Sequence, residues 1–111
     1  MKNIYFISDI HLDTKNSEVT NKFIDFITIN SSDMKELYIL GDLFESWTDD
    51  KYDITKNKLI IEILKKISKN GTKIFLTHGN RDFLIGEYFT KITGVKILPE
   101  NHIVNLNGKK I

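Results

Sequence analysis

The chain has no cysteine and only one proline among its 111 residues. The absence of cysteine excludes disulfide bonds and thiolate metal ligands, which fits a reducing compartment. The formal net charge of +1 leaves no basic excess that would indicate a nucleic-acid backbone as the partner. No apolar run approaches the roughly 20 residues of a membrane-spanning helix, and the N-terminus lacks the apolar stretch of a secretory signal. We therefore expect a cytoplasmic, soluble protein.

The composition fits one small folded unit. Apolar residues make up 41% of the chain and aromatic residues 11%, which is enough for a modest core and too much for a disordered chain. At this length one domain is the upper limit, and we assign residues 1–111 to it.

Three short apolar runs predict buried strands at residues 4–7, 37–40 and 74–76. Between them, apolar residues recur with helical spacing. The first such stretch runs from Val19 to Ile27, with Ser17 as the expected cap, and the second runs from Leu59 to Ile67, with Gly71 as the expected stop. A shorter helix is expected from Phe83 to Ile92, ending at Gly94.

The order β-α-β-α-β implies parallel strands joined by right-handed crossovers, so we expect an α/β fold with helices packed on one sheet. Residues 102–106 then alternate like a strand, and Asn107-Gly108 is a strong hairpin-turn signal. Only three residues follow that turn, so the hairpin is incomplete. We expect the chain to be the front part of a longer protein.

Polar residues follow each of the three predicted strands. Asp9 and His11 follow the first, Asp42 follows the second after Gly41, and Asn80 follows the third after Gly79. Taken singly, these residues are typical of caps and turns. Taken together, they gather at one edge of a parallel sheet, where open α/β folds bind ligands. Alternate residues of an extended chain point the same way, so Asp9 and His11 should be able to chelate one ion. Carboxylate, imidazole and amide ligands predict a divalent-cation site.

These motifs resemble those of the calcineurin-like metallophosphoesterases, whose pattern is Asp-x-His, Gly-Asp and Gly-Asn followed by later histidine motifs. The resemblance covers residues 1–111 and implies the N-terminal part of that fold. It implies that Asp9 and His11 bind the first of two metal ions, that Asp42 bridges both, and that Asn80 binds the second. It also implies that Asn80 and Arg81 contact the substrate, so Asp42, Asn80 and Arg81 are the expected catalytic residues. The usual metal of the family is manganese.

Two longer motifs, residues 38–47 and 78–83, are similar to one branch of the family in lipid A biosynthesis. This branch hydrolyses the diphosphate of UDP-2,3-diacylglucosamine to 2,3-diacylglucosamine 1-phosphate (lipid X) and UMP. The resemblance thus implies a UDP-linked acylated sugar as substrate and peripheral association with the cytoplasmic face of the inner membrane. Arg81 stands where many relatives have histidine; it can grip phosphate but cannot act as a general acid. A phosphate monoester leaving group, with a second pKa of about 6, departs without a proton donor. Arg81 therefore favours diphosphate cleavage.

The sequence leaves two other functions open. The later histidine ligands of the family have no counterpart here, since His102 lies in a different context, so the chain could be a non-catalytic remnant or a complementing half that binds at most one metal. A generic metallophosphoesterase is the third alternative, which the two specific motifs disfavour. Glu45 and Asp82 are expected to orient metal ligands or cap helices, and Phe44 and Trp47 to pack in the core.

Overall fold

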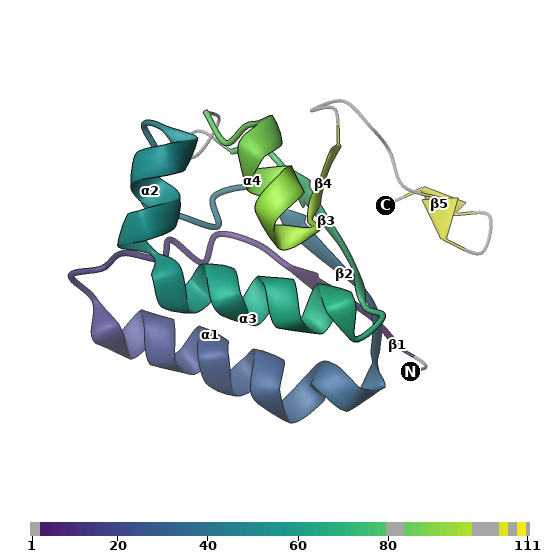
Figure 1. Cartoon of the computed structure of the whole chain (residues 1–111). Coiled ribbons are helices and arrows are strands. Elements are labelled where there is room, and N and C mark those ends of the chain that lie inside the picture. Colours follow the sequence, from purple (N-terminus) through teal and green to yellow (C-terminus); the bar gives the residue numbers. More distant parts are fainter. Residues whose placement is uncertain (1–2, 80–83, 99–104, 107–108, 111) are drawn as a thin grey trace.

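The computed structural model describes residues 3–79, 84–98, 105–106 and 109–110. Along the chain, its elements are β1 (Asn3–Ile7), α1 (Ser17–Asn30), the short 3-10 helix η1 (Ser31–Asp33), β2 (Met34–Leu40), α2 (Asp50–Lys56), α3 (Lys58–Lys69), β3 (Lys73–Thr77), α4 (Glu87–Thr93), β4 (Lys96–Leu98), β5 (Asn105–Leu106) and β6 (Lys109–Lys110) (Figure 1).

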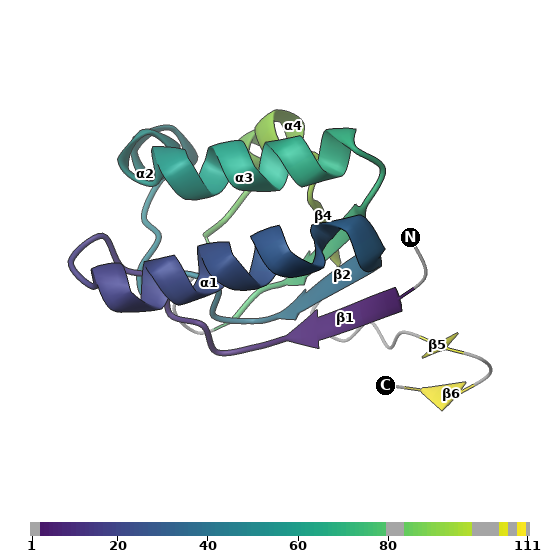
Figure 2. The same ribbon diagram turned by 90° about the horizontal axis from the view of Figure 1, so that it is seen from below.

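The strands β1, β2, β3 and β4 form one parallel sheet in that order. The helices α1 and α3 lie side by side on one face of this sheet (Figure 2). The predicted α/β architecture with parallel strands is therefore confirmed. The fourth strand, β4, was not predicted, because its three residues are too short to form a distinct apolar run.

The core lies between the sheet and the helices. Leu37 and Ile39 of β2 are fully buried there, as are Leu76 of β3 and Leu64 of α3. The expectation that residues 4–7 form a buried strand is wrong for one face of β1. Ile4 and Phe6 are each 37% exposed, because no helix among the described residues covers the second face of the sheet.

Two helices begin elsewhere than the sequence indicated. The cap of α1 is Asn16, whose side chain accepts a hydrogen bond from the Val19 amide, and not Ser17, which is the first helical residue. The last helix, α4, begins at Glu87. Residues 84–86 are not helical, and Phe83 lies outside the described residues. The expected end of α4 at Gly94 is confirmed, since Gly94 has a left-handed φ of 84°.

The helix α2 was missed because its sequence is polar and lacks an apolar stripe. It is held by its aspartates: Asp49 accepts a hydrogen bond from the Tyr52 amide, and the buried Asp53 accepts from the amides of Thr48 and Asp49. At the other end of the chain, β5 and β6 pair antiparallel, as expected of a hairpin around 107–108. The turn itself and His102 lie outside the described residues. Among the described residues, no helix is both long and apolar enough to cross a membrane.

Candidate metal centre

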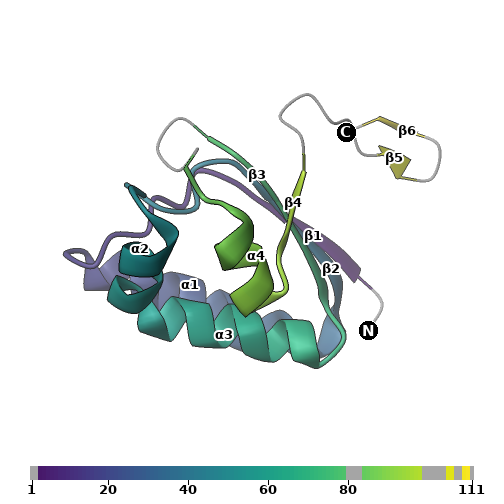
Figure 3. The same cartoon turned by 45° about the horizontal axis from the view of Figure 1, so that its top comes forward.

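The segments that follow β1 and β2 run side by side beyond the sheet. The amide of Asp9 donates to the Gly41 carbonyl oxygen, and the amide of His11 donates to the Asp42 carbonyl oxygen at 3.0 Å. A parallel bridge between Leu12 and Phe44 continues this pairing. Figure 3 shows the same edge of the sheet, where the carboxyl ends of β1, β2 and β3 lie together. The two segments therefore hold Asp9, His11 and Asp42 at one place.

The three residues that carry these side chains share an unusual backbone conformation. Asp9, His11 and Asp42 have φ values of 53°, 54° and 51°. A left-handed conformation costs a non-glycine residue roughly 1–2 kcal/mol. The expectation of an extended Asp9-x-His11 dipeptide is therefore wrong, although the two side chains do meet. Strained backbone of this kind concentrates at functional sites, so its presence here supports a site.

The donor atoms are close enough to share an ion. The Nε2 atom of His11 lies 3.9 Å from Asp9 Oδ1 and 4.0 Å from Asp42 Oδ2. One donor atom from each of the three residues can be chosen so that all lie within 4.8 Å of one another. Ligands bound at about 2.1 Å from a common ion are at most about 4.2 Å apart, so a small closure would complete the coordination. Two carboxylates facing one imidazole also favour a cation electrostatically.

The other ring nitrogen of His11 has a carboxylate beside it. His11 Nδ1 is buried and makes no hydrogen bond of good geometry among the described residues, yet Glu45 Oε2 lies 3.1 Å from it. A metal-bound histidine usually donates its second N–H to such a carboxylate, which fixes the ring orientation. With two carboxylates near Nε2 and a third beside Nδ1, the residues present fit a bound metal ion. The place of Glu45 beside His11 is compatible with one of the two roles expected for it, that of orienting a metal ligand.

Asp42 is packed against the end of β3. A Cβ atom on Gly79 would lie 2.2 Å from Asp42 Oδ1 and 2.3 Å from the Asp42 amide nitrogen, which no real side chain tolerates. The preceding Gly41 has a φ of 82°, a conformation that favours glycine. Gly79 is thus explained by its close approach to Asp42, and Gly41 by its backbone conformation. The side chain of Asp42 is only 16% exposed, whereas that of Asp9 is 71% exposed.

Asn80, Arg81 and Asp82 lie outside the described residues, so their assigned roles stay predictions. The residues on either side of them are described. His78 Nε2 lies 2.7 Å from the Ile85 carbonyl oxygen, so His78 makes a local contact. Phe44 and Trp47 are buried, at 0% and 3% exposure, and pack in the core as predicted.

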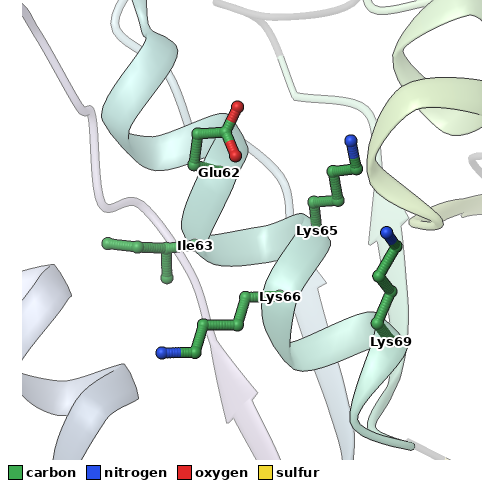
Figure 4. Close-up of a pocket in the computed structure, with 5 residues that line it drawn as sticks. All are labelled: Glu62, Ile63, Lys65, Lys66 and Lys69. Carbon is green, nitrogen blue, oxygen red and sulfur yellow. The ribbon is translucent and has the colours of Figure 1, made fainter.

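A hollow of about 410 Å³ lies elsewhere, on the outer surface of α3. It is lined by Glu62, Ile63, Lys65, Lys66 and Lys69. Figure 4 shows Lys65 and Lys69 on one side of the helix and Ile63 and Lys66 on the other. These side chains do not converge on a common point, and the C-terminal half of α3 leads toward the opposite end of the strands. We therefore place the candidate site at Asp9, His11 and Asp42.

Comparison with known proteins shows which family this chain matches. The model of the family described as calcineurin-like phosphoesterase matches residues 2–110. UDP-2,3-diacylglucosamine hydrolase of Haemophilus influenzae strain PittGG is 43% identical over all 111 residues, which correspond to 47% of its length. The enzymes of the same name from Aliivibrio fischeri and Pseudomonas aeruginosa are 40% and 37% identical over 97% of this chain and 45% of their own lengths.

The chain thus spans about half the length of these curated relatives. Among solved structures, the nuclease MPE of Pseudomonas putida superposes with a TM-score of 0.55 over 89% of this chain and 48% of the nuclease. The sequence identity in that comparison is 18%, so it supports the fold alone.

Proposed function

Because this chain belongs to the calcineurin-like phosphoesterase family, we propose that it is the metal-binding half of a hydrolase that cleaves the diphosphate of UDP-2,3-diacylglucosamine. The products would be lipid X and UMP. The observation that carries the proposal is the cluster of Asp9, His11 and Asp42 at the strand ends. The choice of substrate rests on the relatives named UDP-2,3-diacylglucosamine hydrolase, which are 37–43% identical to this chain.

We propose that Asp9 and His11 hold one divalent ion, Mn²⁺ by family resemblance, and that Asp42 bridges it to a second ion beside Asn80. Bound metal ions supply Lewis-acid stabilisation of the phosphoryl charge and activate a water molecule. The protein's own part is to place the ligands. Asp42 is packed against Gly79, and we propose that Glu45, 3.1 Å from Nδ1, orients His11.

Arg81 supports the choice of a diphosphate over an alkyl phosphate ester. A guanidinium group donates hydrogen bonds to two phosphate oxygens at once and stays protonated. The leaving group of diphosphate cleavage is a phosphate monoester, which needs no acid. Hydrolysis of a simple alkyl phosphodiester as fast as that of the nucleotide diphosphate by the complete protein would contradict this role and favour a generic phosphoesterase.

The test measures metal binding and hydrolysis separately. Isothermal titration of the chain with Mn²⁺ should show binding that is lost in Asp42→Asn and retained in Asp25→Asn, a control on the exposed side of α1. In the complete protein, UMP release from UDP-2,3-diacylglucosamine should follow the same order. Failure of Mn²⁺ to bind the unaltered chain would overturn the proposal.

A complementing half is the second candidate function, because the chain covers only 47% of the H. influenzae relative. It predicts that the chain binds Mn²⁺ but releases UMP only when a second polypeptide with the remaining family motifs is added. We further propose a cytoplasmic location, with peripheral contact to the membrane that holds the acylated substrate. Fractionation of cells that express the protein would test it.

A further inference from the structure

The helix α3 carries an excess of positive charge. It contains four lysines and one glutamate, a net charge of +3, whereas the whole chain carries a formal net charge of +1. The neighbouring helix α1 contains one lysine and two acidic residues, and α2 and α4 each contain equal numbers of both signs. Among the described helices, only α3 therefore has a net positive charge.

The four lysines of α3 share one side of the helix. They are Lys58, Lys65, Lys66 and Lys69. An α-helix has about 3.6 residues per turn, which places all four within about 100° of the helix circumference. Three of them are exposed, and Lys65 is half-buried. The one lysine ion pair among the described residues lies on α1, so the ammonium groups of α3 have no carboxylate partner there.

Helix stability explains only part of this charge. Lys66 and Lys69 lie in the last turn of α3, where a cation stabilises the negative end of the helix dipole. Lys65 lies before that turn. Lys58 is the first residue of the helix, where a cation is unfavourable. The remaining charge is free to serve binding.

The lysines fit an extended anionic surface better than a single small anion. The hollow of about 410 Å³ that three of them line has no point on which their ammonium groups converge. On the same helix, Leu59 is 59% exposed, and Ile63 lines the hollow. Charged and apolar side chains along one helix are typical of lipid-binding surfaces, because the apolar groups enter between the head groups and the lysines meet the phosphates.

We propose that the outer face of α3 is a docking surface for a membrane that contains anionic phospholipids. The lysines contact the phosphate groups, and Leu59 and Ile63 contact the upper part of the acyl layer. The helix packs on the face of the sheet, whereas Asp9, His11 and Asp42 lie at its edge, so lipid on α3 does not cover the candidate metal centre. The choice of a lipid partner rests on the proposed function, because the proposed substrate is itself acylated.

The experiment measures co-sedimentation of the 111-residue chain with lipid vesicles. We expect the chain to bind vesicles made of phosphatidylcholine and phosphatidylglycerol in equal parts, and not to bind vesicles of phosphatidylcholine alone. Charges attract over about 10 Å in about 0.1 M salt but over only about 3 Å in about 1 M salt, so added salt should release most of the chain. Binding to both kinds of vesicle alike, or to neither, would overturn the proposal.

Variants of α3 test the surface itself. A lysine near an anionic membrane strengthens binding about fivefold, so Lys65→Gln and Lys69→Gln combined should weaken binding about 25-fold. Lys51→Gln and Lys91→Gln combined are the matched control, because they remove the same charge from exposed positions of α2 and α4. We expect this control to bind nearly as well as the unaltered chain. Equal losses in the two double variants would show that net charge, and not the face of α3, sets the binding.

The variant Glu62→Gln should produce a gain, which damage to the fold cannot do. It removes the one carboxylate of α3, which lies among the lysines. Binding to the anionic vesicles should therefore strengthen about fivefold. Unchanged or weaker binding would contradict the proposal.

A nucleic acid is the competing partner, since its phosphates would attract the same lysines. Leu59→Gln separates the two partners, because it keeps every charge and removes an apolar group that a lipid layer would bury. We expect it to weaken vesicle binding several-fold. A short DNA duplex that binds the unaltered chain more tightly than the anionic vesicles do, with no effect of Leu59→Gln on either, would overturn the choice of lipid.

These measurements need no metal ion, so they are independent of the test of the proposed function. Absence of vesicle binding would overturn the docking surface and leave Mn²⁺ binding as measured. Absence of Mn²⁺ binding would overturn the proposed function, and the vesicle results would still decide whether α3 binds anionic lipid.

Discussion

At the scale of single residues, the strongest sign of a site is the strained backbone conformation of its three clustered residues. Asp9, His11 and Asp42 all hold φ values near +50°, and each such residue is destabilising by roughly 1–2 kcal/mol. The surrounding hydrogen bonds between the two loops hold them there. A bound cation would offset this strain by neutralising the two carboxylates that the conformation brings together.

Glu45 should be needed for metal affinity, although it is not among the clustered ligands. We expect Glu45→Gln to weaken Mn²⁺ binding by about tenfold, since loss of a carboxylate behind a metal-binding histidine has an effect of this size. Isothermal titration measures it. Glu62→Gln, on the outer surface of α3, is the control. Equal affinities in all three proteins would show that the 3.1 Å contact with His11 does not orient the ring.

The two motif glycines should respond differently to alanine. At Gly79 the added Cβ would overlap Asp42 Oδ1, so Asp42 must move and Mn²⁺ affinity should fall by tenfold or more, on the order of other lost positioning contacts. At Gly41 the nearest atom would be 3.4 Å away, so the expected effect is only the backbone strain, about 1–2 kcal/mol of stability.

Titration with Mn²⁺ and urea unfolding of both variants separate these effects. If Gly41→Ala loses more metal affinity than Gly79→Ala, the close approach of β3 to Asp42 is not what places that carboxylate.

At the scale of elements, the sequence predicted what strong periodicity encodes. The apolar stripe from Leu59 to Ile67 correctly indicated α3, and the runs at residues 37–40 and 74–76 correctly indicated β2 and β3. Prediction from the sequence failed where an element is stabilised by polar groups or by a residue that is distant in the sequence. Nothing near Gly86 in the sequence shows that Asp50 caps α4 from 36 residues away, so the start of that helix was placed too early.

The candidate site, too, was predicted only in part. The order of the motifs predicted that Asp9, His11 and Asp42 would meet, because parallel strands share one edge. The left-handed backbone that brings them together could not be predicted, since it depends on hydrogen bonds between two loops that are more than 30 residues apart in sequence.

Asp53 should stabilise the fold without affecting the site. It is 3% exposed and accepts hydrogen bonds from the Thr48 and Asp49 amides at 2.7 and 3.0 Å. We expect Asp53→Ala to lower the free energy of unfolding by about 3 kcal/mol, because two hydrogen bonds to a charged acceptor are lost. Asp49→Ala, which removes an exposed cap, should cost about 1 kcal/mol.

Urea unfolding gives both values, and Mn²⁺ affinity should be unchanged in each folded variant. A cost for Asp53→Ala no larger than for Asp49→Ala would mean that water replaces the lost carboxylate.

Tyr38 in β2 should make the fold sensitive to alkaline pH. Burial, together with the hydrogen bond and the negative charge of Glu36, raises the pKa of Tyr38 to about 12. In the unfolded chain the pKa is about 10. Both states are neutral below pH 10, so the stabilisation is complete there. Between pH 10 and 12 only the unfolded chain loses the proton, and stability falls with rising pH.

The variant Tyr38→Phe keeps the ring but has no proton to lose. The difference in unfolding free energy between it and the unaltered chain should therefore change between pH 10 and 12 and be constant below pH 9. A difference that stays constant to pH 12 would contradict the raised pKa.

At the scale of the whole molecule, the two faces of the sheet are not alike. Tyr5 of β1 contacts Phe26 of α1, with ring centroids 5.8 Å apart, so alternate residues of β1 point to the helices. Phe6 points the other way and stacks on Tyr38, which stacks on Phe75. This row of three rings crosses β1, β2 and β3 on the face that no described helix covers. Tyr38 is buried within the row, at 7% exposure, whereas Phe6 and Ile4 of β1 are each 37% exposed. Exposed apolar side chains on such a face favour association.

Phe6 is therefore the residue at which to test that face. It is 37% exposed and stacks on a single ring at a centroid distance of 5.0 Å, so Phe6→Thr should cost only about 1 kcal/mol of stability, the size of one aromatic pair. We expect the unaltered chain to self-associate with rising concentration in sedimentation velocity, and Phe6→Thr to reduce this. Ile29→Thr removes a side chain that is 76% exposed at the end of α1 and is the control. If Ile29→Thr reduced association as much as Phe6→Thr, exposed apolar area in general, and not the aromatic row of the open sheet face, would be the cause.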